Sequence, residues 1–163
     1  MNPQSISVIG AGGWGSALAQ LLSAHGLPVT VWAHEPAQVE EINTAHTNRQ
    51  FLPGVNLHPA ITATADMTAA ARGDLIVVVP PSQFLKGVSE QLAAAGVKPG
   101  VPLVCCTKGL EHHTGRLMTQ VLGALLVIVV ARSNEDILMT IIVDIAAAKT
   151  AAEKISLILS FEN

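Results

Sequence analysis

A glycine-rich turn at residues 10–15 constrains the fold of this chain more than any other feature of its sequence. The turn reads Gly-Ala-Gly-Gly-Trp-Gly, with glycines at its first, third and sixth positions. A short β-branched run at residues 5–10 predicts a buried strand before the turn, and apolar residues at helical spacing predict a helix at residues 14–25. A strand, a glycine turn and a helix in this order are typical of the first unit of a parallel, dinucleotide-binding sheet.

Three glycines of the turn have distinct expected roles in such a site. Gly10 permits the tight turn, Gly12 lets the backbone approach a pyrophosphate, and Gly15 permits close packing of the helix on the strand. The pyrophosphate then lies at the N-terminus of the helix, where free N–H groups and the helix dipole favour an anion. The alternative is an ordinary glycine-rich connection between a strand and a helix.

Strands and helices are expected to alternate along the rest of the first 122 residues. Further strands are predicted at residues 28–33, 61–65, 74–79 and 102–106, and further helices at residues 36–46, 67–72, 82–95 and 114–122. Ser82 is expected to cap its helix, and the polar residues 47–54 are expected to form a turn. This alternation predicts a Rossmann-type, doubly wound α/β fold, with a mainly parallel sheet and helices on both faces.

The pattern weakens after residue 122. A sixth strand is predicted at residues 124–131, a strand or a buried helix at residues 137–143, and an alanine-rich helix at residues 145–158. No linker separates this part of the chain from the residues before it. We therefore expect a nucleotide-binding domain at residues 1–122 and an atypical tail at residues 123–163 that packs on the same domain.

The composition and charge exclude several classes of protein. The chain has 163 residues, the length of one ordinary domain, and its formal net charge of −3 favours neither nucleic acid nor an anionic membrane as a partner. Its longest apolar runs are shorter than the roughly 20 residues that span a bilayer. Its first residues lack the features of a signal peptide. These observations predict a cytoplasmic protein without a membrane span.

Two pairs of adjacent residues bear on redox state and metal binding. Cys105 and Cys106 are neighbours in an apolar stretch, and adjacent cysteines rarely form a comfortable disulfide, so we expect reduced thiols in the core. His112 and His113 are expected to lie on the surface, because no further ligand stands at metal-binding spacing from them. The sequence predicts no metal site.

The end of the second predicted strand bears on the choice between NAD and NADP. Sites selective for NAD usually carry an acidic residue there, which binds the ribose 2′-hydroxyl. Ala33 occupies that position here and is followed by His34 and Glu35. A histidine tolerates or attracts a 2′-phosphate, especially when protonated, whereas Glu35 is near enough to serve a ribose, and His34 as a solvated loop residue is a further alternative. On balance the residues favour NADP, or the use of both cofactors.

Five sequence blocks, in order along residues 5–122, carry a resemblance to a known family. The first two are VIGAGGWGSALA, which contains the glycine turn, and VWAH at the end of the second strand. The others are IN with NRQFLPGV, DLIVVVPPSQFL, and TKGLE with TGRLM. Together the blocks resemble bacterial NAD(P)-dependent glycerol-3-phosphate dehydrogenase. The glycine block alone is generic, but the last three together are specific.

The resemblance implies hydride transfer between NAD(P)H and dihydroxyacetone phosphate, which yields sn-glycerol 3-phosphate for phospholipid synthesis. It implies cofactor contacts from Gly13, Trp14, His34 and Lys108. It also gives Lys108 a catalytic role, since the family's lysine contacts both cofactor and substrate and its cation can stabilise a developing alkoxide or the substrate phosphate. Phe51 and Phe84 are expected either to line the nicotinamide side or to belong to the core.

The resemblance ends where the family's second domain begins. In the family, a Ser-Gly-Pro segment leads into an all-helical substrate domain that supplies a second lysine as general base, and residues 127–134 do not match that segment. Lys149 and Lys154 have no family motif around them, so neither is assigned as the base. The main alternative is therefore a cofactor-binding fragment or scaffold without catalysis. A ketopantoate or hydroxyisobutyrate type of reductase is less well supported, because it lacks the TKGLE block. No feature predicts the oligomeric state.

Overall fold

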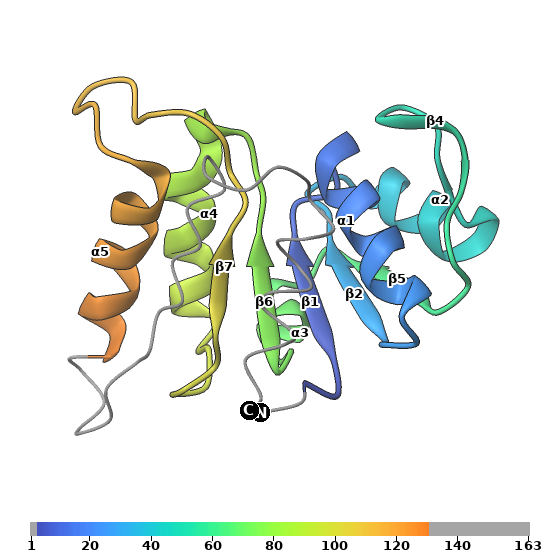
Figure 1. The fold of residues 1–163 in the computed structure, drawn as a ribbon, viewed down its shortest axis with the longest axis horizontal. Coiled ribbons are helices and arrows are strands. Elements are labelled where there is room, and N and C mark those ends of the chain that lie inside the picture. The colour runs from blue at the N-terminus through green and yellow to red at the C-terminus, as the bar shows by residue number, and fades with distance from the viewer. Residues whose placement is uncertain (1–2, 131–163) are drawn as a thin grey trace.

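A five-stranded parallel sheet forms the centre of the structure (Figure 1). The computed structural model describes residues 3–130. The strands are β1 (Ile6–Ile9), β2 (Val29–Trp32), β5 (Ile61–Thr64), β6 (Leu75–Val78) and β7 (Leu103–Cys105), in the order β5-β2-β1-β6-β7 across the sheet. Every pairing within this sheet is parallel. The predicted Rossmann-type α/β fold is confirmed.

The direction of winding reverses between β1 and β6, and this reversal marks a place where a ligand can bind. From β1 the chain runs outward to β2 and β5, then returns to β6 beside β1 and continues to β7. Ile9 pairs with both Trp32 and Val78, so the carboxyl ends of these three strands lie level with one another. In open α/β sheets, ligands bind outside the carboxyl ends of the strands at such a reversal.

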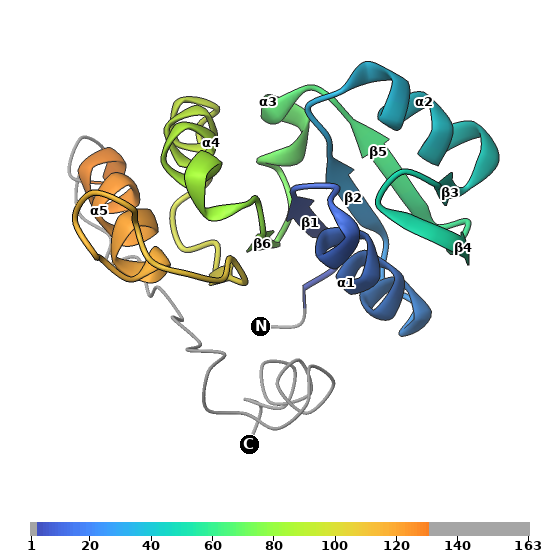
Figure 2. The same cartoon turned by 90° about the horizontal axis from the view of Figure 1, so that it is seen from above.

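Helices cover both faces of the sheet, as Figure 2 shows. Helices α1 (Gly13–Ala24) and α2 (Pro36–Ala45) contribute to one core, and α3 (Met67–Ala70), α4 (Ser82–Ala94) and α5 (Met118–Val130) contribute to the other. Side chains alternate between the two cores along each strand. In β6, for example, Leu75 and Val77 enter the first core whereas Ile76 and Val78 enter the second. Strands buried on both faces explain the continuous apolar runs in the sequence.

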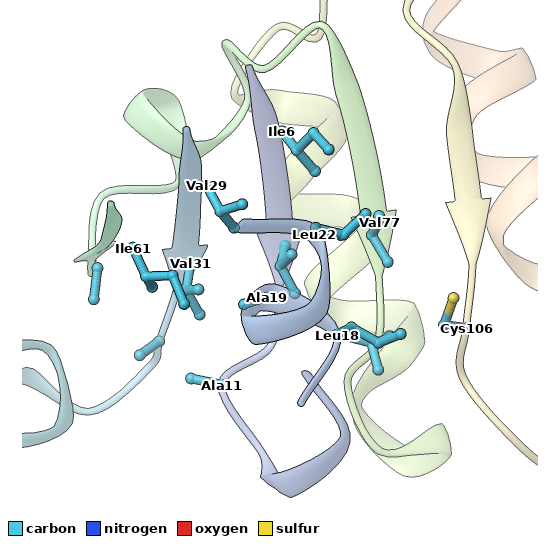
Figure 3. Close-up of a cluster of buried hydrophobic side chains, with 14 of the residues drawn as sticks. Ile6, Ala11, Leu18, Ala19, Leu22, Val29, Val31, Ile61, Val77 and Cys106 are labelled. Carbon is cyan, nitrogen blue, oxygen red and sulfur yellow. The ribbon is translucent and has the colours of Figure 1, made fainter. Parts of the chain in front are cut away.

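Helix α1 packs closely on the sheet and fixes the position of the glycine turn that precedes it. Figure 3 shows the apolar side chains of this contact, which are Leu18, Ala19 and Leu22 from the helix and Ile6, Val29, Val31 and Val77 from the strands. These side chains are at most 5 % exposed. Burying such side chains contributes roughly 1.5–3 kcal/mol each for the larger ones, so the start of α1 is held rigidly at the end of β1.

A short hairpin occupies residues that the sequence predicts as a turn. Strands β3 (Thr47–Asn48) and β4 (Leu52–Asn56) pair antiparallel, apart from the main sheet. Proline and glycine are depleted in strands, yet Pro53 and Gly54 lie within β4, where Gly54 has a φ of +77°. The pairing is irregular and short, with a register shift between Thr47 and Asn48. The stretch therefore carries turn residues without the alternating pattern that would indicate a strand.

Three details of the sequence prediction are wrong at the level of individual elements. Helix α5 begins at Met118 instead of residue 114, because Gly115 adopts a φ of +65° and Leu110 pairs with Leu117 in an isolated antiparallel bridge. The helix then continues to Val130, where the sequence predicts a strand at residues 124–131. A short apolar run does not distinguish a strand from a buried helix. Ser82 is the first helical residue of α4, and the N-cap is Pro81.

Several predictions for the C-terminal part fall on residues outside the described range. These are the elements at residues 137–143 and 145–158 and most of the proposed tail at residues 123–163. The two cysteines lie within the range, and both are buried thiols, as predicted. Among residues 3–130, no helix is long and apolar enough to cross a membrane.

Candidate functional site

The glycine turn joins β1 to α1 at the carboxyl edge of the sheet, and the protein itself requires three of its glycines. Gly10 has a φ of +121°, which residues with a side chain rarely adopt. A Cβ on Gly15 would lie 1.8 Å from the carbonyl oxygen of Gly10, and one on Gly13 would lie 2.5 Å from the carbonyl oxygen of Phe51. The tight turn expected at Gly10 and the close packing expected at Gly15 are thus confirmed.

Gly12 differs from these glycines, because no contact within the described structure requires it. Its φ is an ordinary −66°, and a Cβ at this position would meet no atom within 4 Å. Gly12 is also the N-cap residue of α1, whose first turn contains no acidic residue. The first N–H groups of a helix have no acceptor within the helix. Open space, unpaired donors and the positive end of the helix dipole together suit an anionic group such as a pyrophosphate.

Lys108 and Trp14 approach each other at the same edge of the sheet. The Lys108 Nζ lies 5.1 Å from the centre of the Trp14 ring, within the range of a cation–π interaction. Lys108 follows β7, and the neighbouring Thr107 hydroxyl donates a hydrogen bond of 2.9 Å to the carbonyl oxygen of Pro80. This bond ties the segment after β7 to the segment after β6. The structure therefore brings the lysine to the first turn of α1, which the sequence spacing alone does not establish.

The indole nitrogen of Trp14 is an unsatisfied donor at this site. Trp14 Nε1 is buried and has no hydrogen-bond partner among residues 3–130. A buried donor without an acceptor costs about 1–3 kcal/mol. An acceptor group on a bound ligand would remove that cost. Together with the open space beside Gly12, this orphaned donor shows that the residues present fit a dinucleotide.

His34, Phe51 and Phe84 are all exposed. His34 follows β2 at the carboxyl edge, and its ring centre lies 6.2 Å from that of Trp32. Phe51 is 44 % exposed and Phe84 is 58 % exposed, so the alternative that these two residues belong to the core is wrong. Phe84 lies in the first turn of α4, next to the reversal of the sheet. Contact of these three side chains with a cofactor stays a prediction.

A buried polar network beside the turn is absent from the sequence prediction. The carbonyl oxygen of Ala11 accepts hydrogen bonds from Asn48 Nδ2 at 2.8 Å, Gln38 Nε2 at 2.6 Å and, more weakly, Ser16 Oγ at 3.4 Å. Asn48 Nδ2 also donates to Ser16 Oγ at 2.7 Å. Asn48 is 0 % exposed, although it lies in a polar stretch that predicts a solvated turn. The only signal in the sequence is its place in the NRQFLPGV block.

The described residues offer no metal site. Within residues 3–130, no three side chains of His, Cys, Asp or Glu lie close enough together to hold a metal ion. His112 and His113 are exposed, as predicted, with ring centres 5.7 Å apart. Burial raises the pKa of the Cys105 thiol, so this group stays protonated and unreactive at neutral pH. The turn at Gly12 can therefore bind an anion and Lys108 can present a cation, whereas Cys105 does not serve as a nucleophile.

Comparison with known proteins identifies the family of this domain. Residues 5–134 match the sequence model of the NAD-dependent glycerol-3-phosphate dehydrogenase N-terminus. The chain belongs to this family. The glycerol-3-phosphate dehydrogenase [NAD(P)+] of Parvibaculum lavamentivorans is 47% identical over 120 residues, and that of Geobacter sulfurreducens is 48% identical over 130 residues. Membership explains why the glycine turn, the hairpin and the lysine block occur in one chain.

Solved structures of the family share the fold. The glycerol-3-phosphate dehydrogenase of Coxiella burnetii aligns with a TM-score of 0.70 and 28% identity, over 77% of this chain and 38% of that one. A ketopantoate reductase from Ralstonia eutropha aligns at a TM-score of 0.59 with 18% identity, which shows a common fold alone. The matches to the Parvibaculum and Geobacter relatives cover 74% and 79% of this chain but only 36% and 38% of the relatives. The chain thus spans little more than a third of their length.

Proposed function

We propose that this chain is the cofactor-binding part of a glycerol-3-phosphate dehydrogenase, which transfers a hydride between NAD(P)H and dihydroxyacetone phosphate. The observation that carries the proposal is the open space beside Gly12 at the N-terminus of α1, in a turn whose other glycines are required by internal contacts. The family relatives are named for NAD(P)+. Cys105 and Cys106 are both buried, and neither forms a disulfide within residues 3–130, which supports action in a reducing compartment such as the cytoplasm.

The residues of the turn would hold the pyrophosphate of the cofactor through unpaired backbone N–H groups. No carboxylate in the first turn of α1 opposes the anion. The orphaned Nε1 of Trp14 would donate a hydrogen bond to the cofactor. When bound, NAD(P)H supplies the hydride of the reaction. His34, which follows β2 and is exposed, would select between NADPH and NADH.

Lys108 would present its ammonium group to the substrate side of the site. Its position beside Trp14 keeps the cation at the carboxyl edge of the sheet, near the start of α1. A fixed cation lowers the energy of an oxyanion that develops on a ketone during reduction. It also attracts the phosphate of a substrate such as dihydroxyacetone phosphate. Phe51 and Phe84 would exclude water from the nicotinamide side.

A second candidate function is cofactor binding without efficient turnover. The chain matches only 36% of the length of its Parvibaculum relative, and much of an enzyme's acceleration comes from holding the substrate in place. We expect the 163-residue chain to oxidise NADPH slowly or not at all with dihydroxyacetone phosphate. An oxidation assay beside a Lys108→Ala variant distinguishes the two functions, since substrate-dependent oxidation lost with Lys108 demonstrates a complete site.

Calorimetric titration with NADPH and with NADH tests the proposed function. The expected result is binding of at least one of them with a Kd in the micromolar range or tighter. Gly12→Val should abolish the heat of binding without unfolding the chain, because the added side chain projects into open space. The absence of binding by the wild-type chain to both dinucleotides would contradict the proposal.

A further inference from the structure

The carbonyl oxygen of Ala11, within the glycine turn, accepts hydrogen bonds from three side chains. It accepts from Asn48 Nδ2, Gln38 Nε2 and Ser16 Oγ, at 2.8, 2.6 and 3.4 Å. The strongest two donors come from other parts of the fold, since Gln38 lies on α2 and Asn48 on β3. Gln38 and Asn48 are also joined to each other, by a bond of 3.2 Å from Gln38 Nε2 to Asn48 Oδ1.

Holding this carbonyl fixes the direction of the next N–H group. The peptide unit is planar and trans, so the Gly12 N–H points away from the Ala11 carbonyl oxygen. The carbonyl oxygen faces the amides of the buried Asn48 and the half-buried Gln38, and the Gly12 N–H consequently faces the other way. This N–H has no acceptor among residues 3–130. Donors on the carbonyl also polarise the peptide and strengthen its N–H as a donor.

We infer that Asn48, supported by Gln38, is a positioning residue that orients the Gly12 N–H toward the pyrophosphate of the bound dinucleotide. The inference rests on the proposed function and adds to it a role for two side chains that do not touch the cofactor themselves. Asn48 suits the role because it is fully buried and its amide nitrogen donates both to Ala11 in the turn and to Ser16 in the first part of α1. A peptide that flips freely would have to be ordered on binding, at a cost in affinity.

A purely structural role for Asn48 predicts a different result. In that case the network would only fasten the β3–β4 hairpin to α1, and its loss would lower stability without a specific effect on binding. Asn43 provides a matched control, because its side chain also fixes one backbone unit. Its Nδ2 donates to the Ala63 carbonyl at 2.9 Å, and its Oδ1 accepts from the Ala63 N–H at 2.7 Å. Ala63 lies in β5, away from the glycine turn.

The experiment compares Asn48→Asp and Gln38→Met with Asn43→Asp in calorimetric titrations of the full chain. Asn48→Asp preserves shape but replaces the donor with a carboxylate that repels the Ala11 carbonyl. Gln38→Met removes one donor from a half-buried side chain. This second variant still tests the positioning role if Asn48→Asp fails to fold. Titrations with NADPH and NADH are made well below each variant's melting temperature, which is measured separately.

The expected result is a Kd raised about tenfold by Asn48→Asp and about threefold by Gln38→Met. Both cofactors should be affected equally, because they share the pyrophosphate. Asn43→Asp should lower the melting temperature and leave the Kd unchanged. Wild-type cofactor affinity in both test variants would overturn the positioning role and leave the proposed function standing. The same would follow if Asn43→Asp lost as much affinity as the test variants. Failure of the wild-type chain to bind would overturn the proposed function, and the positioning role with it.

Discussion

The ammonium nitrogen of Lys108 lies 5.1 Å from the ring centre of Trp14, across the reversal of the sheet. The two residues belong to segments almost a hundred positions apart in the chain, the segment that follows β7 and the first turn of α1. Their contact places a cation beside the part of the helix that is best suited to an anion. The contact also makes Trp14 a reporter, because its fluorescence depends on what lies against its ring.

Replacement of Lys108 tests this arrangement. Lys108→Ala removes the cation–π interaction and the charge near the cofactor, so we expect NADPH to bind about two- to fivefold more weakly. Any oxidation of NADPH that depends on dihydroxyacetone phosphate should disappear. Lys108→Arg keeps the charge and should retain most of the binding. Titrations followed by tryptophan fluorescence give the affinities, and unchanged affinity in Lys108→Ala would exclude the lysine from the cofactor site.

Glycine-to-alanine substitutions separate the structural glycines from the one that faces a ligand. Gly15→Ala places a methyl group 1.8 Å from the Gly10 carbonyl oxygen, so we expect the free energy of unfolding to fall by about 2 kcal/mol or more. The methyl group of Gly12→Ala would enter open space at a residue with an ordinary φ, so this substitution should change the free energy of unfolding by less than about 0.5 kcal/mol. Urea denaturation measures both values. A large destabilisation by Gly12→Ala would mean that this glycine serves the fold.

His34 is the residue at which discrimination between the two cofactors is expected. Its ring is exposed at the end of β2, where the 2′ position of the adenosine ribose lies in folds of this type. His34→Ala should weaken the binding of NADPH by about threefold to tenfold, because one hydrogen bond to the 2′-phosphate is lost. The binding of NADH, which lacks this phosphate, should be unchanged. Parallel titrations with both cofactors check this. An equal effect on the two would show that His34 does not contact the 2′-phosphate.

Glu41 gives the hairpin a dependence on pH. The Arg49 backbone N–H donates to its carboxylate at 2.9 Å and the Thr47 hydroxyl donates at 2.7 Å, and these bonds hold the pKa of Glu41 below its ordinary value of 4.5. A lowered pKa in the folded state stabilises the protein above the unfolded pKa, and the stabilisation is lost as the pH falls through the folded pKa. The hairpin should therefore loosen below about pH 4.5.

The Glu41 prediction is checked by comparing the thermal stability of the wild-type chain and Glu41→Gln from neutral pH to about pH 3. The glutamine variant should be the less stable of the two at neutral pH, and the difference should shrink as Glu41 is protonated. Asp66→Asn is a useful comparison, since Asp66 caps α3 through the Thr68 N–H and is remote from the hairpin. A constant difference between wild type and Glu41→Gln across this range would contradict the assigned role.

The sequence predicts the parallel sheet and the glycine turn well because both have strong local patterns. Apolar runs such as the one in β6 alternate with helical patterns, and the turn combines three glycines with a strand and a helix. Lys108 is recognisable from the TKGLE block and from its place at the end of an apolar strand, but no local pattern pairs it with Trp14, which is distant in the chain. The contact between the two depends on the register of β6 with β7, which no local pattern specifies.

The network around Ala11 and the course of α5 were not predictable in the same way. Asn48 lies among polar residues and has the composition of a solvated turn, yet tertiary contacts bury it completely. Its importance comes from hydrogen bonds to residues far away in the sequence. Residues 124–130 are apolar and β-branched, which is equally compatible with a strand, and their helical state follows from a helix that begins at Met118 and packs on α4.

The central claim, that a dinucleotide binds at the glycine turn, is tested most directly by NMR titration of the nitrogen-15-labelled chain with NADPH. We predict that the amide resonances of Gly10, Gly12, Trp14 and Lys108 shift progressively as NADPH is added. The resonances of Gly26 and Gly73, which precede β2 and β6 at the opposite edge of the sheet, should stay in place. No shifts at all, or shifts centred on the edge that contains Gly26 and Gly73, would contradict the account.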